Sequence, residues 1–111
     1  MNFETYKTIK GLQKMEFNTK ETMLVLTHNI TIFWCWGVTK QYNLDNKGLC
    51  LKVSGHFHKG YVIITLDWDD TYIITFISTW GKIKKSVDMV YFDDLVDIID
   101  LHIETEKGLL K

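Results

Sequence analysis

Two runs of β-branched and aromatic residues, 60–68 and 72–80, constrain the fold of this chain more than any other feature. Such residues suit a pleated sheet and lose rotamer freedom in a helix, and no proline interrupts either run. The acidic break at Asp67, Asp69 and Asp70 separates the runs, and short Asp side chains bond their own backbone in turns. The whole segment is therefore predicted to form a β-hairpin.

Alternation of side chains along the two runs predicts which face is buried. The even-numbered positions of the arms are the more apolar set and contain no Thr or Asp. They share a face only if the loop holds an odd number of residues, because a slip of one residue flips every side chain. A two-residue loop at Asp69 and Asp70 also needs positive φ twice, without Gly or Asn to supply it. We therefore expect a loop of three or five residues and an odd face that is partly covered. The even face comprises Val62, Ile64, Leu66, Trp68, Tyr72, Ile74 and Phe76.

The length and composition indicate one compact domain. The chain has 111 residues, and its 46% hydrophobic and 14% aromatic content argues against disorder. A net charge of −1 provides no general attraction to nucleic acid or to an anionic membrane. No apolar run approaches the length of a membrane span, and the N-terminus lacks the basic start and apolar run of a signal peptide. We therefore expect a cytoplasmic protein without a membrane partner.

A helix is predicted on each side of the strands. Asn18 and Glu21 have the form of a capping box and begin a helix over residues 18–29. Asp93 is the expected N-cap of a second helix within residues 90–104, whose apolar stripe recurs at helical spacing.

Three more strands are predicted, at residues 30–38, 49–54 and 82–87. The last of them alternates lysine with apolar residues, which suits the edge of a sheet. The polar segment 40–47 and the glycine-bracketed segment 55–60 are expected to be a loop and a turn.

The order of these elements predicts the fold class α+β. We expect two layers, with a mainly antiparallel sheet of four or five strands, a helix before it and a helix after it. Both helices are expected on one face of the sheet. The single α+β domain is expected to cover residues 18–108, with residues 1–17 as an N-terminal arm or a short helix.

Several features follow one another in order between residues 23 and 104. They are the helix end Thr27-His28-Asn29, the strand 48–53, Gly60 with the strand after it, the turn exit Asp70-Thr71-Tyr72, and Val90-Tyr91 before Asp94-Leu95. This layout resembles a family of small proteins encoded by bacteriophages and by conjugative or other mobile elements. The chain departs from it at Trp34, Cys35, Trp36 and Trp68, where smaller or more polar residues are usual. The resemblance implies a bacterial or phage-borne accessory protein and assigns no catalytic or binding residues.

His56 and His58 are weak candidates for metal ligands. Residues two apart in an extended segment share a side, so both imidazoles can reach one ion. A site needs a third ligand, and nothing in the sequence brings one near. Solvated histidines in a polar turn are the simpler interpretation, and we expect no bound metal or cofactor.

No residue pattern indicates catalysis. Asp67, Asp69 and Asp70 are interpreted as turn formers at a hydrated hairpin tip, not as a general acid and base. Cys35, between two tryptophans, and Cys50 are expected to be buried free thiols, with a bridge between adjacent strands as the alternative. The sequence contains neither a Gly-rich phosphate loop nor a Gly-x-Ser-x-Gly motif. The protein is therefore predicted not to be an enzyme.

Protein–protein interaction is the function that the sequence favours. The lysine-bearing edge strand and the isoleucines left on the odd face of the hairpin can pair or dock with another chain. That chain is expected to be an unidentified protein or a second copy. The predicted interaction residues are Ile63, Ile73, Ile77, Lys82, Lys84 and Lys85.

A module that binds single-stranded nucleic acid is the alternative. Exposed sheet aromatics, among them the four tryptophans, can stack on bases, while Lys82, Lys84 and Lys85 hold phosphates. Against this alternative, the even face requires aromatic residues for its own core. The 14 acidic residues also outnumber the 13 basic ones and provide no electrostatic funnel.

Overall fold

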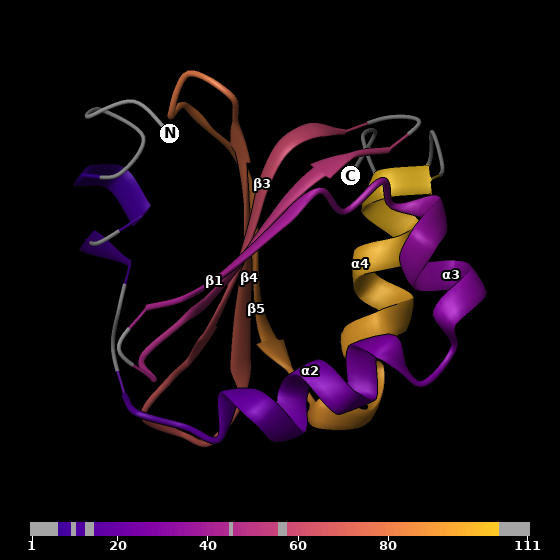
Figure 1. Cartoon of the computed structure of the whole chain (residues 1–111). Coiled ribbons are helices and arrows are strands. Elements are labelled where there is room, and N and C mark those ends of the chain that lie inside the picture. Colours follow the sequence, from indigo (N-terminus) through magenta and orange to yellow (C-terminus); the bar gives the residue numbers. More distant parts are fainter. Residues whose placement is uncertain (1–6, 10, 13–14, 45, 56–57, 105–111) are drawn as a thin grey trace.

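The computed structural model describes residues 7–9, 11–12, 15–44, 46–55 and 58–104. Within them, five strands form one open antiparallel sheet in the order β1-β2-β3-β4-β5. The elements are α2 (Thr19–Thr27), α3 (Ile30–Cys35), β1 (Lys40–Asn43), β2 (Leu49–Ser54), β3 (Lys59–Leu66), β4 (Tyr72–Ser78), β5 (Ile83–Val90), the 3-10 turn η1 (Phe92–Asp94) and α4 (Leu95–Glu104). In Figure 1 the helices α2, α3 and α4 lie on one side of the sheet, and the described N-terminal residues 7–9 and 11–12 lie on the other. The predicted α+β class, with helices before and after a mainly antiparallel sheet, is confirmed.

The central hairpin has the predicted form. Leu66 of β3 lies opposite Tyr72 of β4, and Val62 lies opposite Phe76, so the even positions share a face. The loop 67–71 between the two strands holds five residues, the odd number that the alternation requires.

Hydrogen bonds of the backbone close this loop. The Asp67 N–H donates to the Thr71 carbonyl oxygen at 2.8 Å. Trp68 lies within the loop and is 75% exposed, so its predicted place on the buried even face is wrong. Its position after the last paired residue of β3 removes it from the alternation of the sheet.

Both faces of the sheet are buried. The even face packs against the helices, in a cluster where Ile64 and Phe76 meet Leu26 of α2 and Ile99 of α4. The odd face carries a second, smaller cluster that includes Ile9 from the N-terminal part of the chain, which confirms that this face is partly covered. Its members are Ile9, Cys50, Tyr61, Ile63 and Ile77.

The two cysteines are free thiols in different environments. Cys50 is buried, and burial raises the pKa of its thiol to about 12, so the thiol is protonated at neutral pH. Cys35 is exposed at the end of α3, which means that the prediction of a buried Cys35 is wrong. The alternative of a bridge between adjacent strands is also wrong, because Cys35 is not on a strand.

Residues 30–38 contain the short helix α3 instead of the predicted strand. The Asn29 side chain caps α3 by accepting a backbone hydrogen bond at 3.3 Å. Phe33 and Trp36 are buried three positions apart, the spacing of one helical face, whereas Trp34 is exposed. Packing of that face against the core outweighs the β propensity of this apolar run.

The predicted loop at residues 40–47 begins with β1, which pairs with β2. The prediction is therefore wrong for its first half. Most residues of β1 are exposed at the edge of the sheet, which explains the polar composition. The turn after β1 has the expected chemistry: Asn46 adopts a positive φ of 58°, and its N–H donates to the Asn43 side chain at 2.8 Å. β2 has the predicted bounds, and β5 confirms the predicted edge strand.

Both main helices are confirmed. The Asn18 side chain caps α2 by accepting a hydrogen bond from the Glu21 N–H at 3.0 Å. The C-terminal helix begins with η1, which Tyr91 precedes without a side-chain cap. Asp93 lies inside that turn, so its predicted role as N-cap is wrong. No helix among the described residues is long and apolar enough to span a membrane.

The predicted N-terminal arm or short helix is described in part. Residues 7–9 are helical, and Ile9 is buried in the odd-face cluster. Residues 1–6 and the predicted domain end at residue 108 lie outside the described residues.

Candidate functional site

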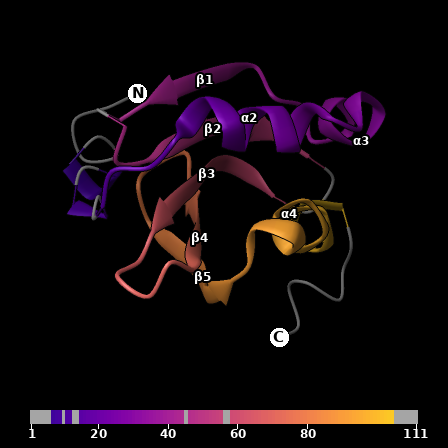
Figure 2. The same ribbon diagram turned by 90° about the horizontal axis from the view of Figure 1, so that it is seen from below.

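An apolar groove lies between α2 and the start of the C-terminal helix. Leu24 and Val25 of α2 line it together with Phe92 of η1, Val96 of α4 and Ile32 of α3. Figure 2 shows α2 on the β1–β2 side of the helical layer and α4 on the other side. The groove has a volume of about 550 Å³, which lies in the range of ligand-binding pockets.

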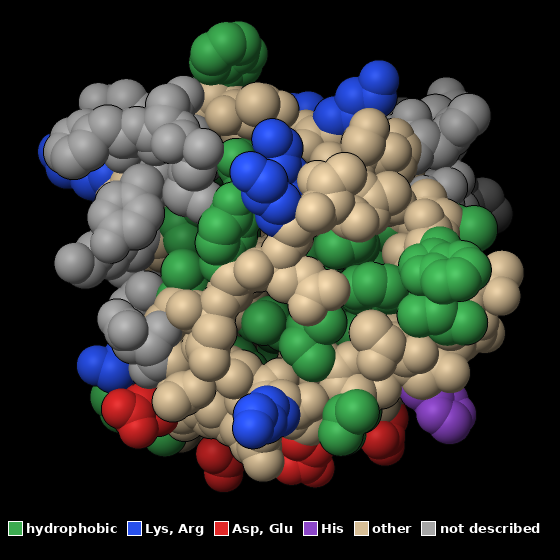
Figure 3. All heavy atoms as spheres, viewed as in Figure 1, with side chains coloured by type: hydrophobic (Ala, Val, Ile, Leu, Met, Phe, Trp, Pro, Cys, Tyr) green, Lys and Arg blue, Asp and Glu red, His purple; other side chains and the backbone are tan. Residues whose placement is uncertain are grey.

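Exposed apolar side chains continue from this groove onto α3. Leu24 is 70% exposed, Ile30 is 44% exposed and Trp34 is 72% exposed. Figure 3 shows hydrophobic side chains gathered over α3. Apolar residues exposed singly are ordinary, but several of them on the adjoining helices α2 and α3 favour contact with another molecule.

Acidic side chains border the groove. Glu21 lines it from α2 and Asp97 lines it from α4. Asp93 and Asp94 of η1 are exposed, and they follow the groove residue Phe92 in the sequence. Figure 3 shows acidic side chains along the lower edge of the view, where α2, the start of the C-terminal helix and the β3–β4 loop lie. The rim therefore favours positive charge in an occupant of the groove.

Sequence reasoning misses this groove. Met23 and Leu26 form the stripe of α2 that packs in the core, and Leu24 lies outside it. In the sequence, the groove is indicated only by this apolar residue on the outer side of a short helix. Phe92 and Val96 lie far from it in the sequence, so only the packing of α2 beside α4 brings the walls together.

The structure separates the predicted interaction residues. Ile63 and Ile77 are fully buried in the odd-face cluster, so they cannot contact a partner in this fold. Ile9 and Leu12 pack on that part of the sheet, which the isolated hairpin pattern does not reveal. Ile73 is half-buried. Lys82 lies in the β4–β5 turn, and Lys84 and Lys85 lie on the edge strand β5.

The four tryptophans do not form a common surface. Trp36 is buried, whereas Trp34, Trp68 and Trp80 are exposed on α3, the β3–β4 loop and the β4–β5 turn. Trp68 and Trp80 flank opposite ends of β4, a strand of seven residues that is roughly 23 Å long. Nucleic-acid binding through the aromatics and lysines stays a prediction, and Trp80 alone lies next to Lys82 in the β4–β5 turn.

His58 lies in a buried aromatic cluster, so its interpretation as a solvated turn residue is wrong. It is 2% exposed, its ring meets Phe76 edge-on at 5.3 Å between centroids, and Phe76 stacks on His102 at 4.9 Å. His58 Nε2 lies 3.2 Å from the carbonyl oxygen of Tyr61. The other candidate ligand, His56, lies outside the described residues. Among those described, no three His, Cys, Asp or Glu side chains are grouped as metal ligands are.

The environment of His58 predicts a loss of stability in acid. Burial lowers the pKa of His58 from 6.5, Lys84 and His102 lower it further, and the hydrogen bond to Tyr61 acts in the opposite direction. Because the folded pKa lies below the unfolded one, the unfolded chain binds more protons. The free energy of unfolding should therefore be highest above pH 6.5 and fall as the pH drops through the lowered pKa.

Urea unfolding across this pH range measures the effect. A His58→Gln variant should lose part of the pH dependence, and His28→Gln, at an exposed histidine, is the matched control. The same pH dependence in the His58→Gln variant and in the wild type would contradict the prediction.

No protein-family model, curated protein or solved structure matches the chain. The resemblance to phage and mobile-element proteins therefore stays a prediction. The candidate site rests on its own geometry: an apolar groove, exposed apolar side chains that continue onto α3, and an acidic rim.

Proposed function

We propose that this protein is an interaction module that holds an amphipathic helix of a partner protein in the groove between α2 and α4. The observation that carries the proposal is the 70% exposure of Leu24 beside four other apolar side chains that line an open groove. An amphipathic helix fills such a groove with apolar residues on one face. The gain is about 25 cal/mol for each Å² of apolar surface removed from water.

The acidic rim defines the chemistry of the partner. Glu21 and Asp97 line the groove, and Asp93 and Asp94 are exposed near Phe92 in the chain. A helix with Lys or Arg beside its apolar anchors meets opposite charge here, whereas an acidic helix meets like charge. The partner segment is therefore a basic amphipathic helix.

An interaction role suits a cytoplasmic accessory protein of a phage or mobile element, as the resemblance of residues 23–104 implies. The surroundings of Cys50 and His58 support interaction over catalysis. Cys50 is buried in the odd-face cluster and His58 is buried against Phe76, where a substrate does not reach them. Glu21 is exposed on α2, where water solvates its carboxylate.

A synthetic basic amphipathic peptide with leucine anchors tests the proposal, with an acidic peptide of the same apolar pattern as the comparison. We expect the basic peptide to shift the methyl NMR signals of Leu24, Val25 and Val96, and the acidic peptide to leave them unchanged. A Glu21→Lys and Asp97→Lys double variant should bind the basic peptide about tenfold more weakly, which corresponds to about 1.4 kcal/mol.

Two further variants distinguish binding in the groove from a general effect of the protein's charge. Glu16→Lys makes the same charge change as Glu21→Lys alone, at an exposed residue that does not line the groove, and it should bind as the wild type does. Leu24→Lys removes the exposed anchor and should abolish the methyl shifts. Equal binding of the basic and acidic peptides, or shifts confined to other surfaces, would rule out the proposed function.

A further inference from the structure

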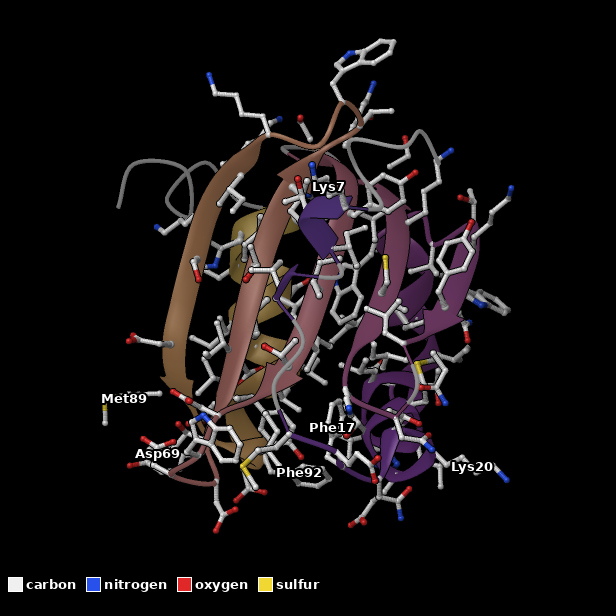
Figure 4. All side chains as sticks on the ribbon, turned by 90° about the vertical axis from the view of Figure 1, so that its left-hand side faces the viewer. Lys7, Phe17, Lys20, Asp69, Met89 and Phe92 are labelled. Carbon is white, nitrogen blue, oxygen red and sulfur yellow. The ribbon has the colours of Figure 1, made fainter. Side chains whose placement is uncertain are left out.

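The strand β5 forms the longer open edge of the sheet. It spans eight residues at one end of the strand order, whereas β1 at the other end spans four. Within the described residues β5 pairs only with β4. It exposes two large apolar side chains, Ile83 at 49% and Met89 at 62%. Figure 4 shows Met89 projecting outward from the end of β5.

The exposed residues of β5 form complementary pairs about Ser86, with unlike charges at one pair of positions and apolar side chains at another. Lys84 lies two positions before Ser86 and Asp88 lies two positions after it. Ile83 and Met89 lie three positions on either side. All four of these residues and Ser86 are exposed.

We propose that β5 pairs with β5 of a second copy of this chain, antiparallel about a twofold axis at Ser86. In that register Lys84 lies opposite Asp88 of the second copy, and Ile83 lies opposite Met89. The twofold axis repeats each pair, so two unlike charge pairs and two apolar pairs form together. The result is a continuous ten-stranded sheet across both copies.

Neighbouring registers lack this complementarity. A register centred on Lys85 places two lysines opposite each other, and one centred on Val87 places Ser86 opposite Asp88. A register centred between Ser86 and Val87 matches Lys85 with Asp88 but leaves Lys84 opposite Met89. Only the Ser86 register joins the two apolar residues and the unlike charges at the same time.

The local geometry of β5 agrees with a centre at Ser86. The pairing with β4 is regular through Lys85, Ser86 and Val87. The register shifts at Lys84 on one side and at Asp88 and Met89 on the other, where Met89 has a positive φ of 53°.

Bulges and lysines on an edge normally prevent pairing with another strand. In the twofold register the bulge at Lys84 of one copy lies opposite the bulge at Asp88 and Met89 of the other copy, so the two irregular stretches match each other. In the proposed dimer each Lys84 lies opposite Asp88 of the other copy. The lysine charge that would disfavour pairing with other edge strands therefore favours pairing with this one.

Sedimentation equilibrium of the full chain between about 10 μM and about 1 mM tests the proposal. The wild type should move from 13.1 kDa toward twice that mass as the concentration rises. Lys84→Asp and Asp88→Lys each create two like-charge pairs and should raise the dimer dissociation constant about tenfold or more. Added salt should weaken the wild-type dimer.

Variants that exchange the charges of Lys84 and Asp88 distinguish a loss of strand pairing from a defect in folding. The double variant Lys84→Asp/Asp88→Lys should dimerise as the wild type does. An equimolar mixture of the two single variants should form a heterodimer, because every pair is then of unlike charge. Dimerisation should be unaffected by Glu21→Lys in the groove, which separates this proposal from the proposed function. A wild type that stays at 13.1 kDa throughout, or single variants that dimerise as well as the wild type, would overturn the proposal.

Discussion

Replacement of Trp36 by alanine should lower the free energy of unfolding by about 4 kcal/mol. The Trp36 side chain is fully buried, and its ring packs against Phe33 at 5.8 Å between centroids. Its indole Nε1 donates a hydrogen bond to Asp100 Oδ1 at 3.0 Å, which ties α3 to α4. Alanine leaves a cavity and removes the donor from a half-buried carboxylate. Urea unfolding followed by circular dichroism measures the change.

A matched control is provided by a neighbouring tryptophan on the same helix. Trp34 is 72% exposed, so Trp34→Ala should change the free energy of unfolding by about 0.5 kcal/mol or less. Trp36→Phe keeps most of the ring and loses the hydrogen bond, and it should cost about 1–3 kcal/mol. Similar losses for Trp34→Ala and Trp36→Ala would mean that α3 does not present the face described here.

Replacement of Gly60 by alanine should cost about 3 kcal/mol or more, or prevent folding. Gly60 has a φ of +143°, which residues with a Cβ rarely adopt. A Cβ at this position would lie 2.2 Å from the carbonyl oxygen of Ile77, a backbone atom that cannot move without breaking the β3–β4 ladder. Thermal unfolding of the purified variant, or its absence from the soluble fraction, measures the effect.

Gly11 supplies the control for this substitution. An added Cβ at Gly11 has no neighbouring atom within 4 Å, so Gly11→Ala should change stability by about 1 kcal/mol or less. If Gly60→Ala unfolds at the wild-type temperature, the close approach of β3 and β4 at this residue is not as described.

The sequence predicts the hairpin because the residue patterns that specify it are local. Alternation of side chains along β3 and β4 and the odd length of the loop both follow from the period of a strand. The same holds for α2, whose first turn Asn18 caps through its own side chain. These elements depend on residues within a few positions of one another.

The local sequence pattern does not predict the helix α3. Its residues have high β propensity, and the sequence 30–38 is a nearly continuous apolar run of the kind that a buried strand has. Burial of Phe33 and Trp36 against α2, α4 and the sheet decides for a helix, and those contacts come from residues distant in the sequence. A local pattern cannot weigh them.

The two proposed interaction surfaces, the groove and the β5 edge, differ in the same way. The charge pattern of β5 can be read from eight consecutive residues, because a strand at an edge presents its own sequence to a partner. The groove joins Leu24 to Phe92 and Val96, and the cover over Ile63 and Ile77 joins them to Ile9. The sequence alone thus determined the paired strands and the capped helix, whose interactions span neighbouring residues. Only the tertiary structure decided which apolar residues stay exposed, because burial depends on segments that meet through folding.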